Sequence, residues 1–278
     1  MVVSILALIA SLAPGRIVST APAATEILFA LGLGERVVGV TQFCNYPPEA
    51  KTKTRVGTFL QPNLEVILAL RPDLVIIQKN PVRLGERLAA MGLKALEVDQ
   101  PSVEAVFDSI RRIAAAAGVQ ARAAELEKRM RSELEGIRRK VGNRPPRSVF
   151  FAVGRDPNAV EGLVAAGKGS YLNELITIAG GRNIFAQSPA AYPKVSVEEV
   201  LARNPEVIID MGDMAQTTNV SEAHKRYVVG LWNRYPALEA VRSRRVYAVA
   251  SDIFVVPGPR IVDAAREFAR MLHPEVQF

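Results

Sequence analysis

Apolar and polar positions alternate along this chain in a pattern that predicts strands followed by helices. Short apolar tracts rich in β-branched residues predict buried strands at residues 16–21, 36–41, 73–78 and 94–99. Amphipathic segments between them predict helices at residues 24–34, 64–71 and 82–92. Strands that alternate with helices of about ten residues indicate βαβ units and a mainly parallel sheet.

Helical periodicity then continues without a strand from residue 102 to residue 141, with one weak point at Gly118. The apolar residues of its second half form one continuous stripe, which consists of Leu126, Met130, Leu134, Ile137 and Val141. An unbroken helix of this length would measure about 60 Å at 1.5 Å per residue, enough to connect two domains. We therefore expect one long helix that ends at the segment GNRPPR.

The strand and helix pattern begins again after this segment. Two segments share residue types at matched positions, AATEILFALGLGERVV in the first half and SYLNELITIAGGRNIF in the second. Glu174 stands at the place of Glu26, and Gly180 stands at the place of Gly32. Strands are predicted at residues 147–154 and 244–250, and helices at residues 224–241 and 259–272.

One phrase occurs twice in the chain. Residues 63–77, NLEVILALRPDLVII, match residues 196–210, SVEEVLARNPEVIID, in kind at nearly every place. The repeat indicates two similar α/β lobes, each with a mainly parallel sheet, bridged by one long helix. Loops gather at the carboxyl ends of parallel strands, so a ligand cleft is expected between the lobes. The expected divisions are an amino-terminal lobe at residues 16–101, a bridging helix at 102–142 and a carboxyl-terminal lobe at 147–278.

The first fifteen residues, MVVSILALIASLAPG, contain an apolar run that is too short to span a bilayer and suits a signal-peptide core. Ser11 and Ala13 provide the small residues of a cleavage site, so residues 1–13 are expected to be removed on export to the periplasm. No basic residue precedes the run and Pro14 would follow the cut, which leaves a buried first strand as the alternative. No cysteine follows the run, so a lipid anchor is not supported.

Composition is that of a globular protein, with 49% hydrophobic and 23% charged residues in 278. The net charge of +7 could suit nucleic acid, but no run of five like charges occurs, and scattered cations on helix surfaces explain it. The chain has one cysteine, Cys44, and two histidines without metal-ligand spacing. It also lacks a phosphate-binding loop and a nucleophile elbow, so we expect no catalytic residues, resident cofactor or metal site.

The segments APAATEILFALGLGERVVGVTQFCNYPPEA, NLEVILALRPDLVII, VSVEEVLARNPEVII and SDIFVVPGPRIVDAA resemble the periplasmic substrate-binding proteins of cobalamin and ferric-siderophore ABC importers. The resemblance covers nearly the whole chain from Arg16 and is greatest to cobalamin-binding members. It implies two α/β lobes and a monomer that captures a large planar ligand and passes it to a dimeric membrane permease.

Aromatic side chains lie in the loops expected at strand ends, where flat rings could hold a planar ligand at low entropic cost. Phe59 and Tyr192 occupy matched places in the two lobes. The resemblance places Phe59, Gln78, Tyr192 and Ile253 at tryptophan positions of the cobalamin proteins, and none is tryptophan here. Asp252 is expected to accept hydrogen bonds from ligand amides, and Cys44 is interpreted as a buried, inert thiol. The full set of predicted ligand-binding residues is Ala23, Ala24, Phe43, Tyr46, Phe59, Gln78, Tyr192, Asp252 and Phe254.

Two acidic residues recur in the repeated phrase, Glu65 and Glu198. A helix dipole favours a carboxylate in the first turn by about 0.3–1 kcal/mol, which is the simplest explanation. Ser196 and Glu199, however, already form a predicted capping box, so Glu198 is not needed for the cap. The resemblance implies that Glu65 and Glu198 dock on arginines of the permease, one in each subunit of its dimer.

Cobalamin is therefore the first expected ligand, and a ferric siderophore or haem is the alternative within the class. An enzyme or metal-cluster protein on a related two-lobed fold is a second alternative, opposed by the few His and Cys residues. A nucleic-acid binder is a third, supported by charge alone.

Overall fold

The computed structural model describes residues 13–79, 82–212, 221–249 and 251–278. The chain forms two compact units, one of Met1–Val98 with Ile110–Ala124 and one of Asp99–Ser109 with Glu125–Phe278. The expectation of two α/β units with mainly parallel sheets is confirmed. The predicted signal peptide, apart from Ala13, lies outside the described residues.

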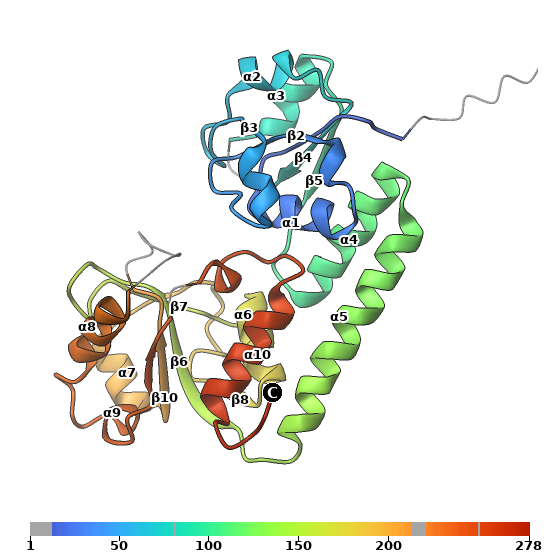
Figure 1. The fold of residues 1–278 in the computed structure, drawn as a ribbon. Coiled ribbons are helices and arrows are strands. Elements are labelled where there is room, and N and C mark those ends of the chain that lie inside the picture. The colour runs from blue at the N-terminus through green and yellow to red at the C-terminus, as the bar shows by residue number, and fades with distance from the viewer. Residues whose placement is uncertain (1–12, 80–81, 213–220, 250) are drawn as a thin grey trace, which may run out of the picture. The chain divides into compact units, whose positions relative to one another are not determined.

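The first unit has a parallel sheet with strand order β3-β2-β1-β4-β5. Apolar residues of α2 and α3 pack on one face of this sheet, and α1 contacts β1, β2 and β4 (Figure 1). Its elements are β1 (Ile17–Ser19), α1 (Pro22–Ala30), η1 (Gly34–Arg36), β2 (Val37–Val40), η2 (Pro48–Thr52), β3 (Thr54–Arg55), α2 (Leu64–Ala69), β4 (Leu74–Gln78), α3 (Leu84–Ala90) and β5 (Ala95–Val98).

The second unit has a sheet with order β11-β10-β6-β7-β9, in which β8 also pairs with β6. The pairs of β6 with β8 and β10, and of β10 with β11, are parallel, whereas β7 is antiparallel to both β6 and β9. Its elements are β6 (Arg147–Gly154), β7 (Leu163–Ala165), α6 (Tyr171–Ile178), β8 (Gly181–Asn183), β9 (Lys194–Val195), α7 (Val197–Arg203), β10 (Val207–Asp210), α8 (Glu222–Trp232), α9 (Glu239–Arg242), β11 (Val246–Ala248), η3 (Asp252–Phe254) and α10 (Ile261–Leu272).

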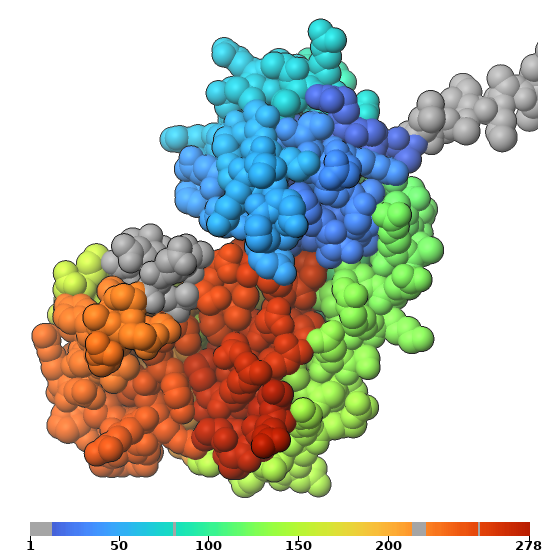
Figure 2. Space-filling view, in the orientation of Figure 1, coloured from blue at the N-terminus to red at the C-terminus, as the bar shows by residue number. Residues whose placement is uncertain are grey.

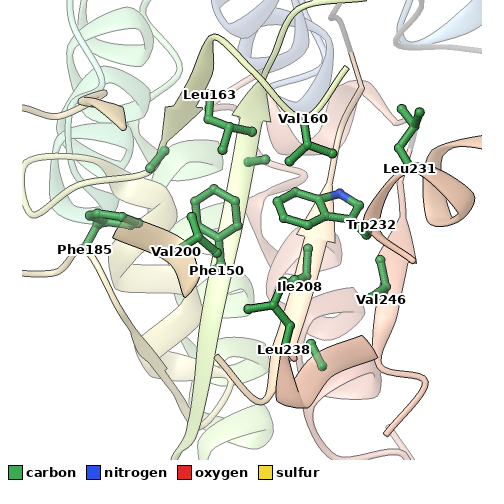
Figure 3. Packing of buried hydrophobic residues seen from close by; sticks show 13 residues of the cluster. Phe150, Val160, Leu163, Phe185, Val200, Ile208, Leu231, Trp232, Leu238 and Val246 are labelled. Atoms are coloured by element: carbon green, nitrogen blue, oxygen red, sulfur yellow. The ribbon is translucent and has the colours of Figure 1, made fainter. Parts of the chain in front are cut away.

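Successive residues of the central strand β6 support the two faces of this sheet, as strand alternation requires. Phe150 meets Phe185 and Trp232 edge to face, each at 5.8 Å between ring centroids (Figure 3). Phe151, on the other face, meets Phe268 of α10 at 5.2 Å. Each face therefore has its own aromatic cluster.

The predicted long helix is divided in two, which corrects the sequence-based expectation. α4 (Val103–Ala117) and α5 (Gln120–Val141) are separated by Gly118, whose φ of +72° is left-handed and ends α4. Arg131 of α5 pairs with Glu104 at 2.6 Å and lies 4.0 Å over the Phe107 ring of α4, so the two helices run antiparallel side by side (Figure 1).

The predicted apolar stripe lies wholly on α5, and all five of its residues are buried. At 1.5 Å per residue α5 is about 33 Å long, roughly half the expected length. Arg266 of α10 donates to Glu133 of α5 at 2.8 Å, and the red and green surfaces of these helices adjoin in Figure 2.

Two further expectations were wrong in detail. The helix predicted at residues 224–241 ends at Trp232, and a separate short helix begins at Glu239 after Pro236, which supplies no backbone N–H. The sequence pattern also missed β7, β8 and β9, which have only three, three and two residues. Strands this short have no measurable alternation, so their pairing depends on tertiary structure.

The internal repeat is visible in matched local structures. Asn63 accepts the Val66 N–H at the start of α2, and Ser196 accepts the Glu199 N–H at the start of α7. Gly32 after α1 and Gly180 after α6 both have left-handed φ values, +70° and +77°.

Both copies of the repeated phrase contain a proline followed by an acidic residue, Pro72 with Asp73 and Pro205 with Glu206. In each unit this acidic residue hydrogen-bonds the start of a neighbouring strand. Asp73 accepts the N–H groups of Gly15 and Arg16, just before β1, at 2.9 and 2.8 Å. Glu206 accepts the N–H of Ser148, in β6, at 2.7 Å. These bonds fix β4 against β1 and β10 against β6 at their amino-terminal ends.

The carboxylate of Glu206 makes the stability of the second unit depend on pH. Burial acts to raise the pKa of Glu206, but hydrogen bonds from Ser148 and the guanidinium of Arg147 outweigh it, so the pKa lies below 4.5. Because the folded-state pKa is lowered, the stabilisation is complete above the unfolded-state value and is lost as pH falls through the folded-state value.

We expect Glu206→Gln to reduce the free energy of unfolding at pH 7 by about 1 kcal/mol, since the partly exposed ion pair with Arg147 is screened. The difference from wild type should shrink as the pH is lowered below about 4.5. Urea unfolding at a series of pH values measures both effects. Glu161→Gln, at an exposed carboxylate, is the matched control and should be neutral at every pH.

Candidate ligand-binding site

Four of the predicted ligand residues lie at one edge of the first unit's sheet. All its strand pairs are parallel, so the carboxyl ends of the strands share that edge. Phe43 and Tyr46 follow β2, Phe59 follows β3, and Gln78 is the last residue of β4. The topology thus brings loops from three strands to one edge, although β3, which has only two residues, was not among the predicted strands.

The aromatic residues at this edge are exposed to different degrees. Phe43 is 57% exposed and Tyr46 is 44% exposed, while Phe59 and Gln78 are half-buried. Large apolar side chains exposed along one edge of a sheet are typical of a binding surface. Their exposure agrees with ligand contact, which remains a prediction.

The loop that carries Phe43 and Tyr46 is fixed by hydrogen bonds to its backbone. Arg55 donates to the carbonyl oxygens of Thr41 and Cys44 at 2.8 and 3.3 Å. The fixed guanidinium therefore orders the loop without occupying its exposed side.

Cys44 contributes to the same anchor. Its side chain is fully buried, with Thr25 Oγ1 and Thr41 Oγ1 each 3.1 Å from Sγ. Burial raises the pKa of the Cys44 thiol, against the weaker opposite effect of these hydrogen bonds. The thiol is a neutral packing group, as interpreted from the sequence, and does not have the exposure of a reactive one.

Three predicted ligand residues lie in the core instead. Ala23 and Ala24, in the first turn of α1, are 1% and 0% exposed. Phe254 is 2% exposed, packs at 5.0 Å from Phe268, and its carbonyl accepts the Tyr171 hydroxyl at 2.8 Å. These three side chains pack within their own units and leave almost none of their surface exposed.

Asp252 begins η3, two residues before Phe254, and is half-buried. Arg260 Nη1 donates to Asp252 Oδ1 at 2.8 Å, and the two side chains are only 13% and 21% exposed, Arg260 first. The ion pair fixes the carboxylate beyond the carboxyl end of β11, and its oxygens have capacity to accept further hydrogen bonds.

Tyr192 is 46% exposed and lies between two residues that pair with the β7 region. Gly167 N–H donates to Ala191 O at 2.8 Å, and Ala165 N–H donates to Pro193 O at 2.9 Å. Although nearly half of Tyr192 is exposed, desolvation raises the pKa of its phenol, which stays protonated at physiological pH.

The matched places of Phe59 and Tyr192 have a structural counterpart. Each precedes a helix-capping residue of the repeat, Asn63 or Ser196, by the same number of residues. In the first unit Pro62 forms an antiparallel bridge with Gly57, and at the same place in the second unit β9 pairs with β7. Both aromatic residues are thus held by a short antiparallel contact ahead of the repeated helix.

Glu65 and Glu198 are exposed in the first turns of α2 and α7. Neither forms a hydrogen bond or ion pair with any other residue that the structure describes. Glu199 differs, because its carboxylate accepts the Ser196 N–H at 2.9 Å and completes the predicted capping box. The cap therefore explains Glu199 and leaves Glu198 without a local role.

Sequence reasoning missed a buried polar cluster at the ends of β6 and β10. Arg155 Nε and Trp232 Nε1 donate to Asp210 Oδ2 at 2.9 and 2.6 Å, and Gly212 N–H donates to Oδ1 at 2.6 Å. Breaking such a buried pair typically costs 3–5 kcal/mol. A charged residue at the end of each of two apolar strands was the available signal, and the cluster fixes the carboxyl edge of this sheet.

Within the described residues, no group of three or more His, Cys, Asp or Glu side chains could hold a metal ion. No helix in the described part of the chain is both long and apolar enough to cross a bilayer.

Residues 17–253 match the family model described as periplasmic binding protein. The chain belongs to this family. It is 30% identical over 263 residues to the vitamin B12-binding protein of Photorhabdus laumondii, covering 94% of this chain and 89% of that one. It is also 30% identical over 270 residues to the uncharacterized ABC transporter substrate-binding lipoprotein YvrC of Bacillus subtilis, covering 94% and 81%.

Solved structures of this family share the fold along most of the chain. The vitamin B12 binding protein BtuF of Vibrio cholerae superposes with a TM-score of 0.78 at 29% identity, covering 94% of this chain and 97% of that one. The apo haem-binding protein RhuT of Roseiflexus sp. RS-1 superposes with a TM-score of 0.77 at 28% identity, covering 94% and 99%. These relatives are named as binding proteins rather than enzymes, and the similarity includes both predicted ligand classes.

Proposed function

We propose that this protein is the exported receptor of an ABC importer and that its ligand is cobalamin. The observation that carries the proposal is the similarity to a vitamin B12-binding protein over 94% of this chain. The exposed aromatic side chains at the carboxyl edge of the first unit's sheet support it. The protein binds and delivers its ligand as a monomer, without bond chemistry, resident cofactor or nucleic acid.

The proposed contacts suit a large planar ligand whose rim carries amides. Rings stack on the flat faces with little loss of side-chain entropy. A side-chain amide and a fixed carboxylate hydrogen-bond the polar rim, and because they are partly desolvated they reject ligands that leave them unpaired. The residues assigned are Phe43, Tyr46, Phe59, Gln78, Tyr192 and Asp252.

Haem or a ferric siderophore is the second candidate, favoured by the similarity to the haem-binding protein RhuT. The neutral phenol of Tyr192 is a hydrogen-bond donor in the free protein rather than a ready anionic iron ligand. The absorbance spectrum of protein purified from its native host distinguishes a corrin, a porphyrin and a ferric chelate.

The partner in transport is the dimeric membrane permease of the importer. Glu65 and Glu198 supply one unpaired, exposed carboxylate in each unit, which suits two equivalent arginines of a permease dimer. The location proposed is the periplasm, after removal of residues 1–13.

Cobalamin should bind with measurable heat in a calorimetric titration, and Phe59→Ala or Tyr192→Ala should each weaken binding by about 1–3 kcal/mol, roughly 5- to 150-fold, because a stacked ring is lost. Tyr227→Ala is the matched control, since this 44% exposed aromatic residue lies on α8. Absence of heat with cobalamin but binding of haem or a ferric siderophore would transfer the assignment to the second candidate.

Export should leave a mature chain that begins near Pro14 or Gly15. Amino-terminal sequencing of periplasmic material measures this directly. A cytoplasmic product that retains Met1 would contradict it.

The double variant Glu65→Lys, Glu198→Lys should abolish uptake and leave ligand affinity nearly unchanged. Lysine facing arginine across an interface costs several kcal/mol, more than the lost dipole interaction within each helix. Transport by the reconstituted importer and calorimetry of the ligand separate the two effects.

Glu199→Lys is the control for this experiment. It should lower the thermal unfolding midpoint by removing the capping box, at a cost of about 1 kcal/mol, and leave transport intact. Normal transport by the double variant would mean that the two carboxylates contribute only a favourable interaction with their helix dipoles.

A further inference from the structure

A pocket of about 270 Å³ lies beside α7 in the second unit, next to the helix that carries Glu198. Its lining includes Lys194 of β9 and both Glu199 and Arg203 of α7. Gln187 and Ser188 add polar groups to the wall. The pocket is therefore mainly polar and contains two cations and one carboxylate.

The two cations lack acidic partners. Lys194 is exposed and makes no side-chain hydrogen bond or ion pair with any residue the structure describes. Arg203 Nε donates to Ile184 O at 3.2 Å, and its guanidinium lies 4.6 Å over the Phe185 ring. No described carboxylate forms an ion pair with Arg203. Its guanidinium is thus held in place while its charge remains uncompensated.

The one carboxylate in the lining is already engaged. Glu199 Oε2 accepts a hydrogen bond from the Ser196 N–H at 2.9 Å, and the Glu199 N–H donates to Ser196 Oγ at 3.2 Å. No hydrogen bond or ion pair joins Glu199 to Arg203 among the described contacts, and the one carboxylate is outnumbered by the two cations. The pocket consequently has an excess of positive charge that favours a carboxylate from outside.

The first unit has no such charge at the matching places of the repeat. Gln61 stands where the second unit has Lys194, and Leu70 stands where it has Arg203. The exposed helix starts of the two units share a glutamate but differ in the charge around it. This difference is not required by folding, because both helices are capped and both pack on their sheets.

The pocket and Glu198 lie close together on α7. Successive helical residues are about 100° apart, so Glu199 lies about 100° and Arg203 about 140° around α7 from Glu198. A partner surface that extends from Glu198 around the start of α7 reaches this pocket. We propose that the pocket binds an aspartate or glutamate side chain of the permease, an inference that rests on the docking role proposed for Glu198.

The planar guanidinium of Arg203 can bind such a carboxylate through two parallel hydrogen bonds, with Lys194 adding charge at the rim. The contact between the second unit and the permease then contains two ion pairs of opposite direction. Glu198 pairs with a permease cation, and Arg203 pairs with a permease carboxylate. Such a pattern rejects partner surfaces that carry charge of only one sign.

The test measures the dissociation constant of the ligand-loaded protein for the importer reconstituted in nanodiscs. Arg203→Glu is expected to raise this constant at least tenfold, and Arg203→Lys, which keeps the charge, no more than about threefold. Arg129→Glu, at an exposed arginine of α5 with no side-chain partner among the described residues, is the matched charge reversal and should change it less than twofold. Lys194→Glu gives a second measurement that does not disturb the Phe185 contact, with an expected rise of at least fivefold.

Ligand affinity and the thermal unfolding midpoint must stay near wild type in the variants compared. Tight docking of both Arg203→Glu and Lys194→Glu, alongside loss of docking in Glu198→Lys, overturns the inference and leaves the proposed function intact. Unchanged docking in all three variants removes the docking role of Glu198 as well, whereas failure of ligand binding is seen separately by calorimetry. Submillimolar binding of inorganic phosphate that disappears in Arg203→Glu, together with unchanged docking, would assign the pocket to a free anion instead.

Discussion

Parallel pairing of the central strands is the constraint on which the rest of each unit depends. Because β1, β2, β4 and β5 all point the same way, every connection must return over the sheet, and α1, α2 and α3 supply the return. The carboxyl ends then share one edge, which gathers Phe43, Phe59 and Gln78 from distant parts of the sequence. At the amino-terminal edge of each sheet an acidic residue accepts a backbone N–H of the neighbouring strand or of the residue just before it. Asp73 does so for β1 in the first unit, and Glu206 does so for β6 in the second.

Periodicity and capping chemistry predicted most of this architecture because both are local. The capping box of Ser196 and Glu199 and the left-handed glycines after α1 and α6 follow from residues within a few positions. The break at Gly118 does not, since a glycine inside a helix costs only about 1 kcal/mol and other interactions decide whether the helix continues. Here Arg131 meets Glu104 and Phe107 only when the chain reverses, and this contact joins residues far apart in sequence.

In the candidate site, too, local features could be predicted from the sequence, whereas contacts between distant residues could not. The sequence indicates that an aromatic residue follows a strand, but not which way its ring points. Phe43 and Phe254 both follow strands, and one is 57% exposed while the other is 2% exposed. Phe254 is buried because Phe151 and Phe268, from separate elements, form a cluster that receives it. For the buried Asp210 cluster the sequence shows charged residues at the ends of two apolar strands but not that they meet, because its members come from separate parts of the chain.

The first unit is built from two separate segments of the chain, which affects how it folds during synthesis. That unit is completed by residues 110–124, which follow a stretch belonging to the other unit. Arg36 donates to Ala117 O at 3.1 Å, and Arg122 donates to Leu31 O at 3.0 Å, so the later segment is bonded to the earlier one. A nascent chain that has emerged from the ribosome only as far as Val98 therefore holds an incomplete core. The amino-terminal half of the protein must wait for the middle of its own sequence before it can close.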